Sequence, residues 1–150
     1  MKPEKLGGVV PATVTPFQKD ESVDHKALVK LIDWNMSQGA DTFFIGGSSA
    51  ECYLLNPQER MEVFETAASF RDRAYLVAHV GAVSTKQAAE YARCAADLGY
   101  DAIAATPPFY YGFGAEEIYG YYADIADAAG MPVLIYNFPG NTGKNFDLGN

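Results

Sequence analysis

Short apolar runs alternate with amphipathic stretches along the chain. The runs are nearly continuous rather than alternately apolar and polar, which is typical of parallel strands covered by helices. We expect five strands, over residues 7–17, 42–45, 75–80, 102–105 and 132–136. Between these runs, apolar residues recur at helical spacing. The pattern therefore predicts strands and helices in regular alternation.

The predicted helices carry their own boundary signals. Asp24, Asn56 and Ser84 stand at N-cap positions, and Pro57 follows Asn56 at the first helical position. A fourth helix is expected over residues 115–129. Helices commonly end at a glycine, which accepts the left-handed conformation without strain. Such glycines are Gly39, Gly99 and Gly130.

This order of elements is compatible with an open doubly wound sheet or with a closed barrel. Neither Gly-x-Gly-x-x-Gly nor Gly-x-x-x-x-Gly-Lys-Ser/Thr follows the first strand. A nucleotide-binding Rossmann or P-loop domain therefore loses its main support. No linker or change of composition divides residues 1–150, so we expect one α/β domain.

Composition indicates a soluble globular protein, since 49% of the residues are hydrophobic and 20% are charged. No apolar run is long enough to span a bilayer, and the first residues lack the pattern of a secretory signal. The net charge is −8 and the 11 Lys and Arg residues are dispersed, so we expect neither a nucleic-acid nor a membrane partner. Cys52 and Cys94 indicate reduced thiols in a cytoplasmic protein.

In both architectures the carboxyl ends of the strands carry the site. Residues 46–49, Gly-Gly-Ser-Ser, follow the second strand. Two glycines let the backbone turn tightly and expose N–H groups, and two hydroxyls add donors. The segment is a candidate site for a small anion such as a carboxylate, or else an ordinary strand-to-loop turn. No cluster of metal-ligating residues occurs at these ends, so we expect no metal site.

Tyrosines also follow the predicted strands. Tyr136 ends the fifth strand, where its hydroxyl could relay a proton or could bond to the backbone as a core tyrosine does. Tyr110 and Tyr111 follow the fourth strand and could act likewise or form a subunit contact. His79 lies in an apolar run, which favours a buried, hydrogen-bonded role. For Glu51 we favour a salt-bridge or capping role.

Four segments at these strand ends occur together in one order. Residues 46–51, Gly-Gly-Ser-Ser-Ala-Glu, resemble Gly-Gly-Ser-Thr-Gly-Glu of N-acetylneuraminate lyases and Gly-Thr-Thr-Gly-Glu of dihydrodipicolinate synthases. Residues 78–85 and 108–117 resemble the third- and fourth-strand loops of the lyases. Residues 136–143, which begin Tyr-Asn-Phe-Pro, resemble the fifth-strand signature of both. The chain therefore resembles this superfamily of pyruvate-dependent aldolases over nearly its whole length.

The resemblance implies a (β/α)₈ TIM barrel, of which residues 1–150 would be the N-terminal portion, with the first five strands and four helices. It implies a class I aldolase, in which a lysine attacks the keto group of pyruvate and the iminium acts as electron sink. A C–C bond to an aldehyde is then made or broken without a metal or other cofactor. The family's Schiff-base lysine ends the sixth strand, beyond residue 150.

The resemblance also implies roles for individual residues. Ser48 and Ser49, with Gly47, would bind the carboxylate of pyruvate. Tyr136 would relay protons near the Schiff base. Tyr110 matches a tyrosine that reaches the neighbouring subunit's site, so a homo-oligomer, a dimer or tetramer, is implied.

Three residues depart from the family pattern. Ser49 replaces a threonine, which keeps the hydroxyl but frees its rotamer. Ala50 replaces a glycine, which is unfavourable if the position needs a positive φ. Asn141 stands where dihydrodipicolinate synthases carry an arginine for the second substrate. We therefore expect an N-acetylneuraminate lyase or a 2-keto-3-deoxy sugar-acid aldolase, with dihydrodipicolinate synthase as the alternative.

Two further alternatives remain open. One is a non-catalytic, truncated relative that binds a 2-keto acid, and the other is a flavodoxin-like open sheet with an unrelated ligand. Lys144 follows the fifth strand, and its surroundings favour a solvated loop lysine over a stand-in nucleophile. A five-strand piece of a barrel would also expose a parallel edge and an apolar interior, both of which promote aggregation.

Overall fold

A parallel four-stranded sheet forms the centre of the computed structural model, which describes residues 2, 4 and 6–146. The strands are β1 (Thr42–Ile45), β2 (Tyr75–His79), β3 (Ala102–Ala105) and β4 (Val133–Ile135). They lie in the order β1-β2-β3-β4, so each strand pairs with the next one along the chain. The helices are α1 (His25–Ser37), α2 (Pro57–Ala68), α3 (Thr85–Asp97), α4 (Ala115–Ala129) and the short α5 (Pro139–Thr142).

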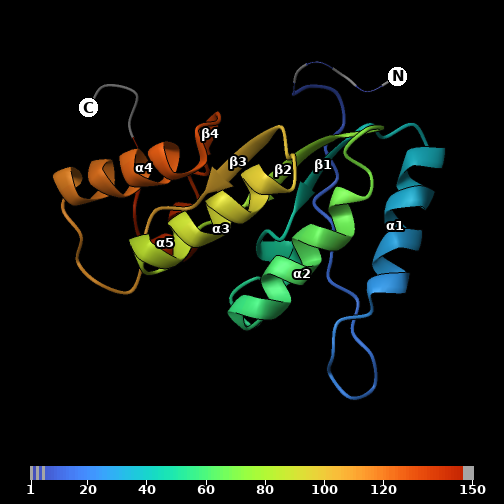
Figure 1. Cartoon of the computed structure of the whole chain (residues 1–150). Helices are drawn as coiled ribbons and strands as arrows, with labels where there is room; N and C mark the ends of the chain where they lie inside the picture. Colours follow the sequence, from blue (N-terminus) through green and yellow to red (C-terminus); the bar gives the residue numbers. More distant parts are fainter. Residues whose placement is uncertain (1, 3, 5, 147–150) are drawn as a thin grey trace.

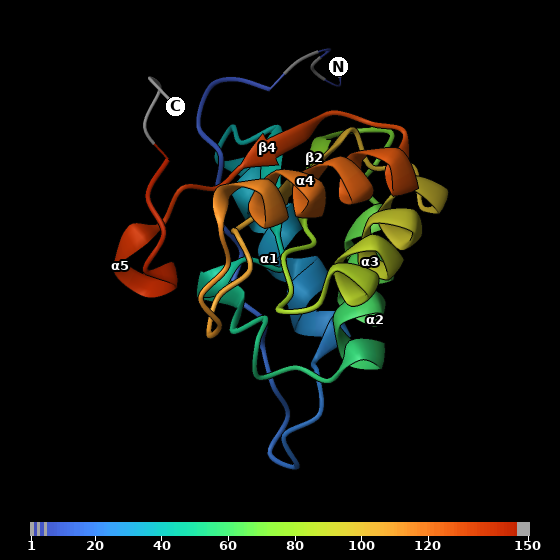
Figure 2. The same ribbon diagram turned by 90° about the vertical axis from the view of Figure 1, so that its left-hand side faces the viewer.

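Helices α1 to α4 lie side by side along the sheet (Figure 1). Each of the first three packs against the next one in the chain. The short helix α5 lies apart from α2 and α3 (Figure 2). One helix per crossover, with each strand beside its predecessor, is the arrangement from which a barrel wall is built.

Alternate residues of each strand face two different environments. Phe43 of β1, Leu76 of β2 and Ile103 of β3 belong to a large core that also contains the inner faces of α1 to α4. Val77 and Ala104 belong to a small cluster on the opposite face, which contains no helical residue in the described part of the chain. Helices on one face only favour a barrel over a doubly wound sheet, which carries helices on both.

The helices begin where side chains can bond to their first N–H groups. Asp24 accepts from the N–H of Ala27 at 2.9 Å, and Ser84 caps α3 in the same way. Asn56 and Glu59 form a reciprocal capping box at the start of α2. These caps confirm the helix starts that the sequence predicts at all three positions.

The structure corrects the prediction of a first strand over residues 7–17. Residues 7–17 do lie beside β1, but they pair with it only through the bridge between Ala12 and Phe44. The Thr13 N–H donates to the Phe44 carbonyl at 3.1 Å, and the Phe44 N–H donates to the Pro11 carbonyl at 3.0 Å. Pro11 and Pro16 have no N–H to extend the ladder. The described residues therefore form four strands and two isolated bridges, of which only the one between Ala12 and Phe44 involves β1, rather than five strands.

Two absences among the described residues bear on the class of protein. None of the helices, over the described residues, has the length and apolarity needed to cross a membrane. The same residues contain no group of three or more His, Cys, Asp or Glu side chains placed to hold a metal ion. For residues 137–150 the sequence leaves open a loop or the start of a further helix; α5 (Pro139–Thr142) forms there, and residues 147–150 lie outside the described part.

Candidate functional site

The residues that the sequence assigns to substrate binding meet in one pocket at the carboxyl ends of the strands. This pocket, the turn pocket, has a volume of about 300 Å³. Its lining consists of Val10, Ala12, Phe44, Gly47, Ser48, Ser49 and Tyr136. Four of the five predicted site residues therefore lie around one cavity. The fifth, Tyr110, is not among them.

The turn at residues 46–51 takes its shape from two glycines. Gly46 has a φ of +69°, and a Cβ there would lie 2.8 Å from the ring of Phe64. Gly47 is extended, but a Cβ there would lie 2.7 Å from the ring of Phe44. Gly46 is thus required by conformation and by space, and Gly47 by space alone. The close backbone approach brings the following serines to the pocket.

The next residues form one 3₁₀ turn, η1 (Ser48–Ala50). The hydroxyls of Ser48 and Ser49 make no hydrogen bond with any other described residue, so they are free to bind a ligand. Ala50 does not have a positive φ; the left-handed residue is Glu51, with a φ of 56°. The replacement of the family's glycine by Ala50 is therefore compatible with this turn. The Thr15 hydroxyl donates to the Ala50 carbonyl at 2.8 Å and ties the turn to the first segment.

Tyr136 follows β4 and is half-buried. Its N–H donates to the Ala105 carbonyl at 2.9 Å, which continues the ladder with β3. Its ring meets those of Phe44 and His79 edge to face, at centroid distances of 5.8 and 6.0 Å. It stacks on Phe138 at 5.6 Å. Three aromatic neighbours thus fix the ring, while its hydroxyl has no hydrogen-bond partner among residues 2, 4 and 6–146.

Other tyrosines show what a structural hydroxyl does here. Tyr121 on α4 donates to the Ala82 carbonyl and accepts from the Ala82 N–H, both at 3.0 Å. Tyr122 donates to the Ala105 carbonyl at 2.9 Å. Both hydroxyls serve the backbone, as the alternative interpretation of Tyr136 would require of it. Tyr136 does not follow this pattern.

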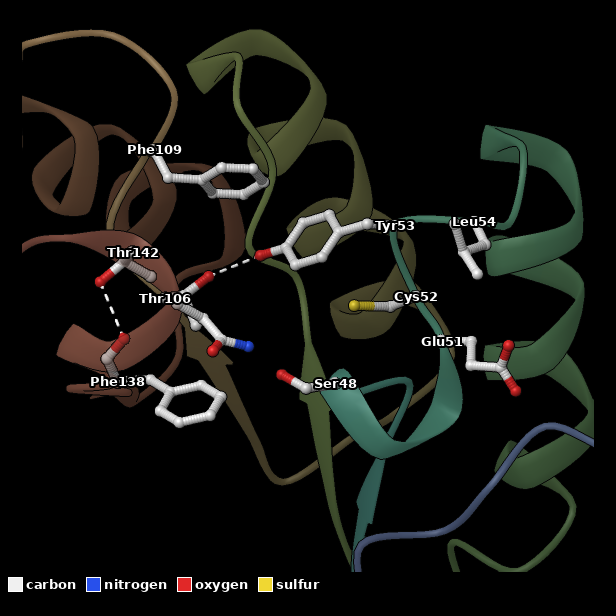
Figure 3. Close-up of a pocket in the computed structure, with 10 residues that line it drawn as sticks. Ser48, Glu51, Cys52, Tyr53, Leu54, Thr106, Phe109, Phe138 and Thr142 are labelled. Carbon is white, nitrogen blue, oxygen red and sulfur yellow. Dashed lines mark hydrogen bonds between the residues drawn. The ribbon is translucent and has the colours of Figure 1, made fainter.

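A second cavity of about 510 Å³, the outer pocket, adjoins the turn pocket and shares Ser48 with it (Figure 3). It is lined by Ser48, Glu51, Cys52, Tyr53, Leu54, Thr106, Phe109, Phe138, Asn141 and Thr142. The Tyr53 hydroxyl lies 2.6 Å from the Thr106 hydroxyl, and Phe109 packs against the Tyr53 ring. The outer pocket has the hydroxyls and the size to receive a polar substrate next to the turn pocket.

Sequence reasoning overlooked Tyr53 as a lining residue. It lies in the loop before α2, and no periodicity points to it. Thr106 directly follows the predicted fourth strand, and this position could have identified it as a residue that lines the site. Asn141, which replaces the synthase arginine, also lines the outer pocket and is exposed.

His79 is fully buried, which confirms the structural role that its apolar surroundings predict. Burial, and secondly the positive charge of Arg60, lower the pKa of His79 to about 3. The imidazole is therefore neutral at physiological pH. Arg60 is itself only 2% exposed. The sequence contained a signal for the burial of Arg60, because Arg60 stands four residues before Phe64 and therefore lies on the same face of α2.

Tyr110 lies away from both pockets. It is 86% exposed, its ring packs against Tyr111 at 5.0 Å, and its φ is 78°. A positive φ is uncommon for a bulky residue. A use for Tyr110 in a neighbouring subunit's site stays a prediction.

The remaining candidates have structural surroundings. Burial raises the pKa of the Cys52 thiol and that of the half-buried Cys94 thiol, so neither is an activated nucleophile. Lys144 is not the freely solvated lysine that the sequence favours. It is half-buried, and its ammonium group donates to the Phe113 carbonyl at 2.6 Å.

Comparison with known proteins agrees with this geometry. The family model for the dihydrodipicolinate synthetase family matches residues 5–149. N-acetylneuraminate lyase from Rhizobium meliloti is 41% identical over 139 residues, which are 92% of this chain and 46% of that protein.

Solved structures agree as well. The CdNal protein of Clostridium difficile, solved in complex with mannosamine, superposes with a TM-score of 0.93 at 35% identity, covering 97% of this chain and 51% of that one. Dihydrodipicolinate synthase from Acinetobacter baumannii, solved with pyruvate, gives a TM-score of 0.86 at 36% identity, covering 92% and 48%.

The chain spans about half the length of these relatives. Its four parallel strands, with the helices on one face, correspond to part of the TIM barrel of these enzymes. Because the family model covers nearly the whole chain and the fold agrees throughout, the chain belongs to the dihydrodipicolinate synthetase family.

Proposed function

We propose that the protein to which this chain contributes is a Schiff-base lyase of the N-acetylneuraminate lyase type, which acts on pyruvate and an aldehyde. The observation that carries this is the turn pocket. It brings together around a single cavity two serine hydroxyls and one tyrosine hydroxyl that have no hydrogen-bond partner among the described residues. The names of the similar proteins support the choice of reaction.

In this proposal Ser48, Ser49 and the backbone at Gly47 hold the carboxylate of the 2-keto acid. The lysine of the complete barrel attacks the keto carbon, water leaves, and an iminium forms. In the cleavage direction, removal of a proton from the substrate hydroxyl breaks the C–C bond and releases the aldehyde. The electron pair moves into the iminium as an enamine, which takes up a proton at carbon; water then hydrolyses the resulting iminium and releases pyruvate and the free lysine. Tyr136 would carry these protons; its fixed ring and a hydroxyl without a partner among the described residues support this role.

The outer pocket would receive the aldehyde part of the substrate. Its hydroxyls at Tyr53 and Thr106 suit a polyhydroxylated chain, which needs hydrogen bonds rather than one counter-charge. Asn141 is neutral where a synthase would use an arginine for a carboxylate. This favours a sugar-acid substrate over the aspartate semialdehyde of dihydrodipicolinate synthases.

The assembly and location belong to the same proposal. A homo-oligomer, either a dimer or a tetramer, would bring the exposed Tyr110 to a neighbouring site. The buried or half-buried thiols fit a reducing, cytoplasmic setting.

Trapping the Schiff base tests this function. We expect full-length protein treated with pyruvate and borohydride to gain one covalent pyruvate per chain by intact mass. We also expect pyruvate release from N-acetylneuraminate or a 2-keto-3-deoxy sugar acid. Absence of an adduct would refute the Schiff-base mechanism. Ligand binding with neither adduct nor turnover would support the non-catalytic alternative, and condensation with aspartate semialdehyde would support the synthase.

A further inference from the structure

Arg60 is a buried cation whose polar partners among the described residues do not include a carboxylate. Its Nη1 donates to the Gly81 carbonyl at 2.9 Å, and its Nη2 donates to the His79 carbonyl at 2.6 Å. The guanidinium carbon lies 4.5 Å from the centre of the Tyr91 ring. Its Nε has no partner in the described part of the chain, and none of the three ion pairs found there includes Arg60.

Such an arrangement is unfavourable unless the charge interacts with an anion from outside the described residues. Removing a cation from water without an opposite charge is strongly unfavourable, and carbonyl groups and a ring compensate for it only in part. If α2 needed only to be held against β2, a neutral side chain would do so with less desolvation. An anion that binds nearby would recover part of this unfavourable energy.

Arg60 lies directly behind the turn at residues 46–51. Its Nη2 is 3.1 Å from Nδ1 of His79, and the same Nδ1 is 3.2 Å from the Gly46 carbonyl oxygen. The Cys52 sulfur, just after the turn, is 3.7 Å from this nitrogen. One imidazole ring therefore separates the guanidinium from the backbone that presents Ser48 and Ser49.

The His79 ring between them is neutral and links two strand ends. Its Nε2 accepts from the Thr106 N–H at 3.3 Å, so the ring proton is on Nδ1, which donates to the Gly46 carbonyl. This tautomer connects the end of β1 to the end of β3. A second proton would bring two donors together at Thr106 and would add a positive charge beside Arg60. Burial first, and the guanidinium second, thus maintain the neutral form that braces the turn.

We propose that Arg60 is a positioning residue for the carboxylate subsite: it holds the turn in place through His79, and its charge favours the bound 2-keto acid anion. This rests on the proposed function, because it requires the carboxylate to bind at Ser48 and Ser49. Arg60 does not touch the substrate and takes no part in proton transfer.

Pyruvate and its neutral analogue pyruvamide separate the effect of charge from the effect of structure. In full-length Arg60→Met protein, the concentration that gives half-maximal borohydride trapping should rise roughly tenfold for pyruvate, the effect of one unit charge across a partly buried site. For pyruvamide the rise should be clearly smaller, since the neutral amide loses only the bracing of the turn and gains little from a nearby charge. Arg73→Met is the matched control, because Arg73 is exposed and its one ion pair among the described residues is with Asp33, at 3.5 Å. It should leave both concentrations unchanged.

Arg60→Lys keeps the charge but not the guanidinium geometry, so it should preserve the preference for pyruvate over pyruvamide. Circular dichroism checks whether Arg60→Met folds. If it does not, the preference of Arg60→Lys for pyruvate over pyruvamide tests the proposal. Equal losses for pyruvate and pyruvamide, or loss of the preference in folded Arg60→Lys, would overturn the proposal. If the wild-type protein is not trapped with pyruvate, the proposed function has failed instead.

Discussion

Tyr136 differs from Tyr121 and Tyr122 in what its hydroxyl contacts. Tyr121 and Tyr122 use theirs to bond backbone groups, whereas Tyr136 has a ring held by aromatic neighbours and a hydroxyl without a partner in the described residues. A fixed ring with a free hydroxyl is suited to proton transfer, because the group is in place before the substrate arrives.

We expect Tyr136→Phe to lower kcat for cleavage by about a hundredfold or more, the usual contribution of a proton-transferring group. The KM for the substrate that is cleaved to pyruvate should change much less, because phenylalanine keeps the packing of the ring. Steady-state kinetics of the full-length protein measures both. Tyr119→Phe is the control, since Tyr119 is 78% exposed and lines neither pocket. A kcat within twofold of wild type would show that Tyr136 relays no proton.

Gly46 combines a left-handed φ with a close contact, and the two effects can be separated. Gly46→Ala should lower the free energy of unfolding by about 2 kcal/mol or more, from the conformation and from the clash with Phe64. Gly130→Ala has the same kind of φ, +61°, but nothing within 4 Å of the new Cβ. It should be destabilised by only about 1 kcal/mol. Urea unfolding of both variants measures the difference. Equal losses would mean that the Phe64 ring moves aside.

At the scale of elements, one side chain of β2 joins three strands. His79 bonds the ends of β1 and β3 while its own carbonyl accepts from Arg60. The sequence indicated a buried histidine, but it did not indicate these partners. They come from residues 19 to 33 positions away along the chain, and only the parallel register brings them together.

The neutral state of His79 makes stability depend on pH. Its pKa is about 3 in the folded chain and 6.5 in the unfolded one, so the unfolded state binds the extra proton between these values. Stability is therefore fully present above pH 6.5 and falls as the pH decreases towards 3. Between pH 7 and pH 5 we expect a loss of about 2 kcal/mol, measured by urea unfolding.

His79→Gln provides the comparison. This variant should be less stable at pH 7, and its free energy of unfolding should change little between pH 7 and pH 5. The other histidine, His25, is more exposed and is present in both proteins. An unchanged pH dependence in His79→Gln would assign the effect to other groups.

Prediction from the sequence worked better for helices than for the first strand. Caps at Asp24, Asn56 and Ser84 are local, so the helix starts could be predicted from neighbouring residues alone. Residues 7–17 have the apolar character of a strand, but the two prolines limit their pairing with β1 to one bridge. That limit depends on which groups face the neighbouring strand, and apolar character does not reveal it.

At the scale of the whole molecule, apolar side chains remain exposed, among them Ile135 at 54%, Val14 at 49% and Val9 at 77%. The face of the sheet that carries Phe44, Val77 and Leu134 has no helix packed against it among the described residues. In the related barrels, which are about twice as long, this face lines the barrel interior. Residues 1–150 expressed by themselves should therefore self-associate.

Light scattering after size-exclusion chromatography measures this association, and binding of a hydrophobic dye measures the exposed apolar surface. Both signals should be larger for residues 1–150 than for an equal concentration of full-length protein. A monodisperse monomer with weak dye binding would show that this face is covered in another way.

The sequence by itself determined the alternation of strands and helices, the caps, and the four motifs that indicated the family. These depend on spacing along the chain and on short segments. Only the tertiary structure decided that helices cover one face of the sheet, that the left-handed residue of the turn is Glu51 rather than Ala50, and that Arg60 lies buried behind that turn. The reason is physical: burial, backbone conformation in a tight turn and the surroundings of a buried charge depend on parts of the chain that meet only when the strands pair.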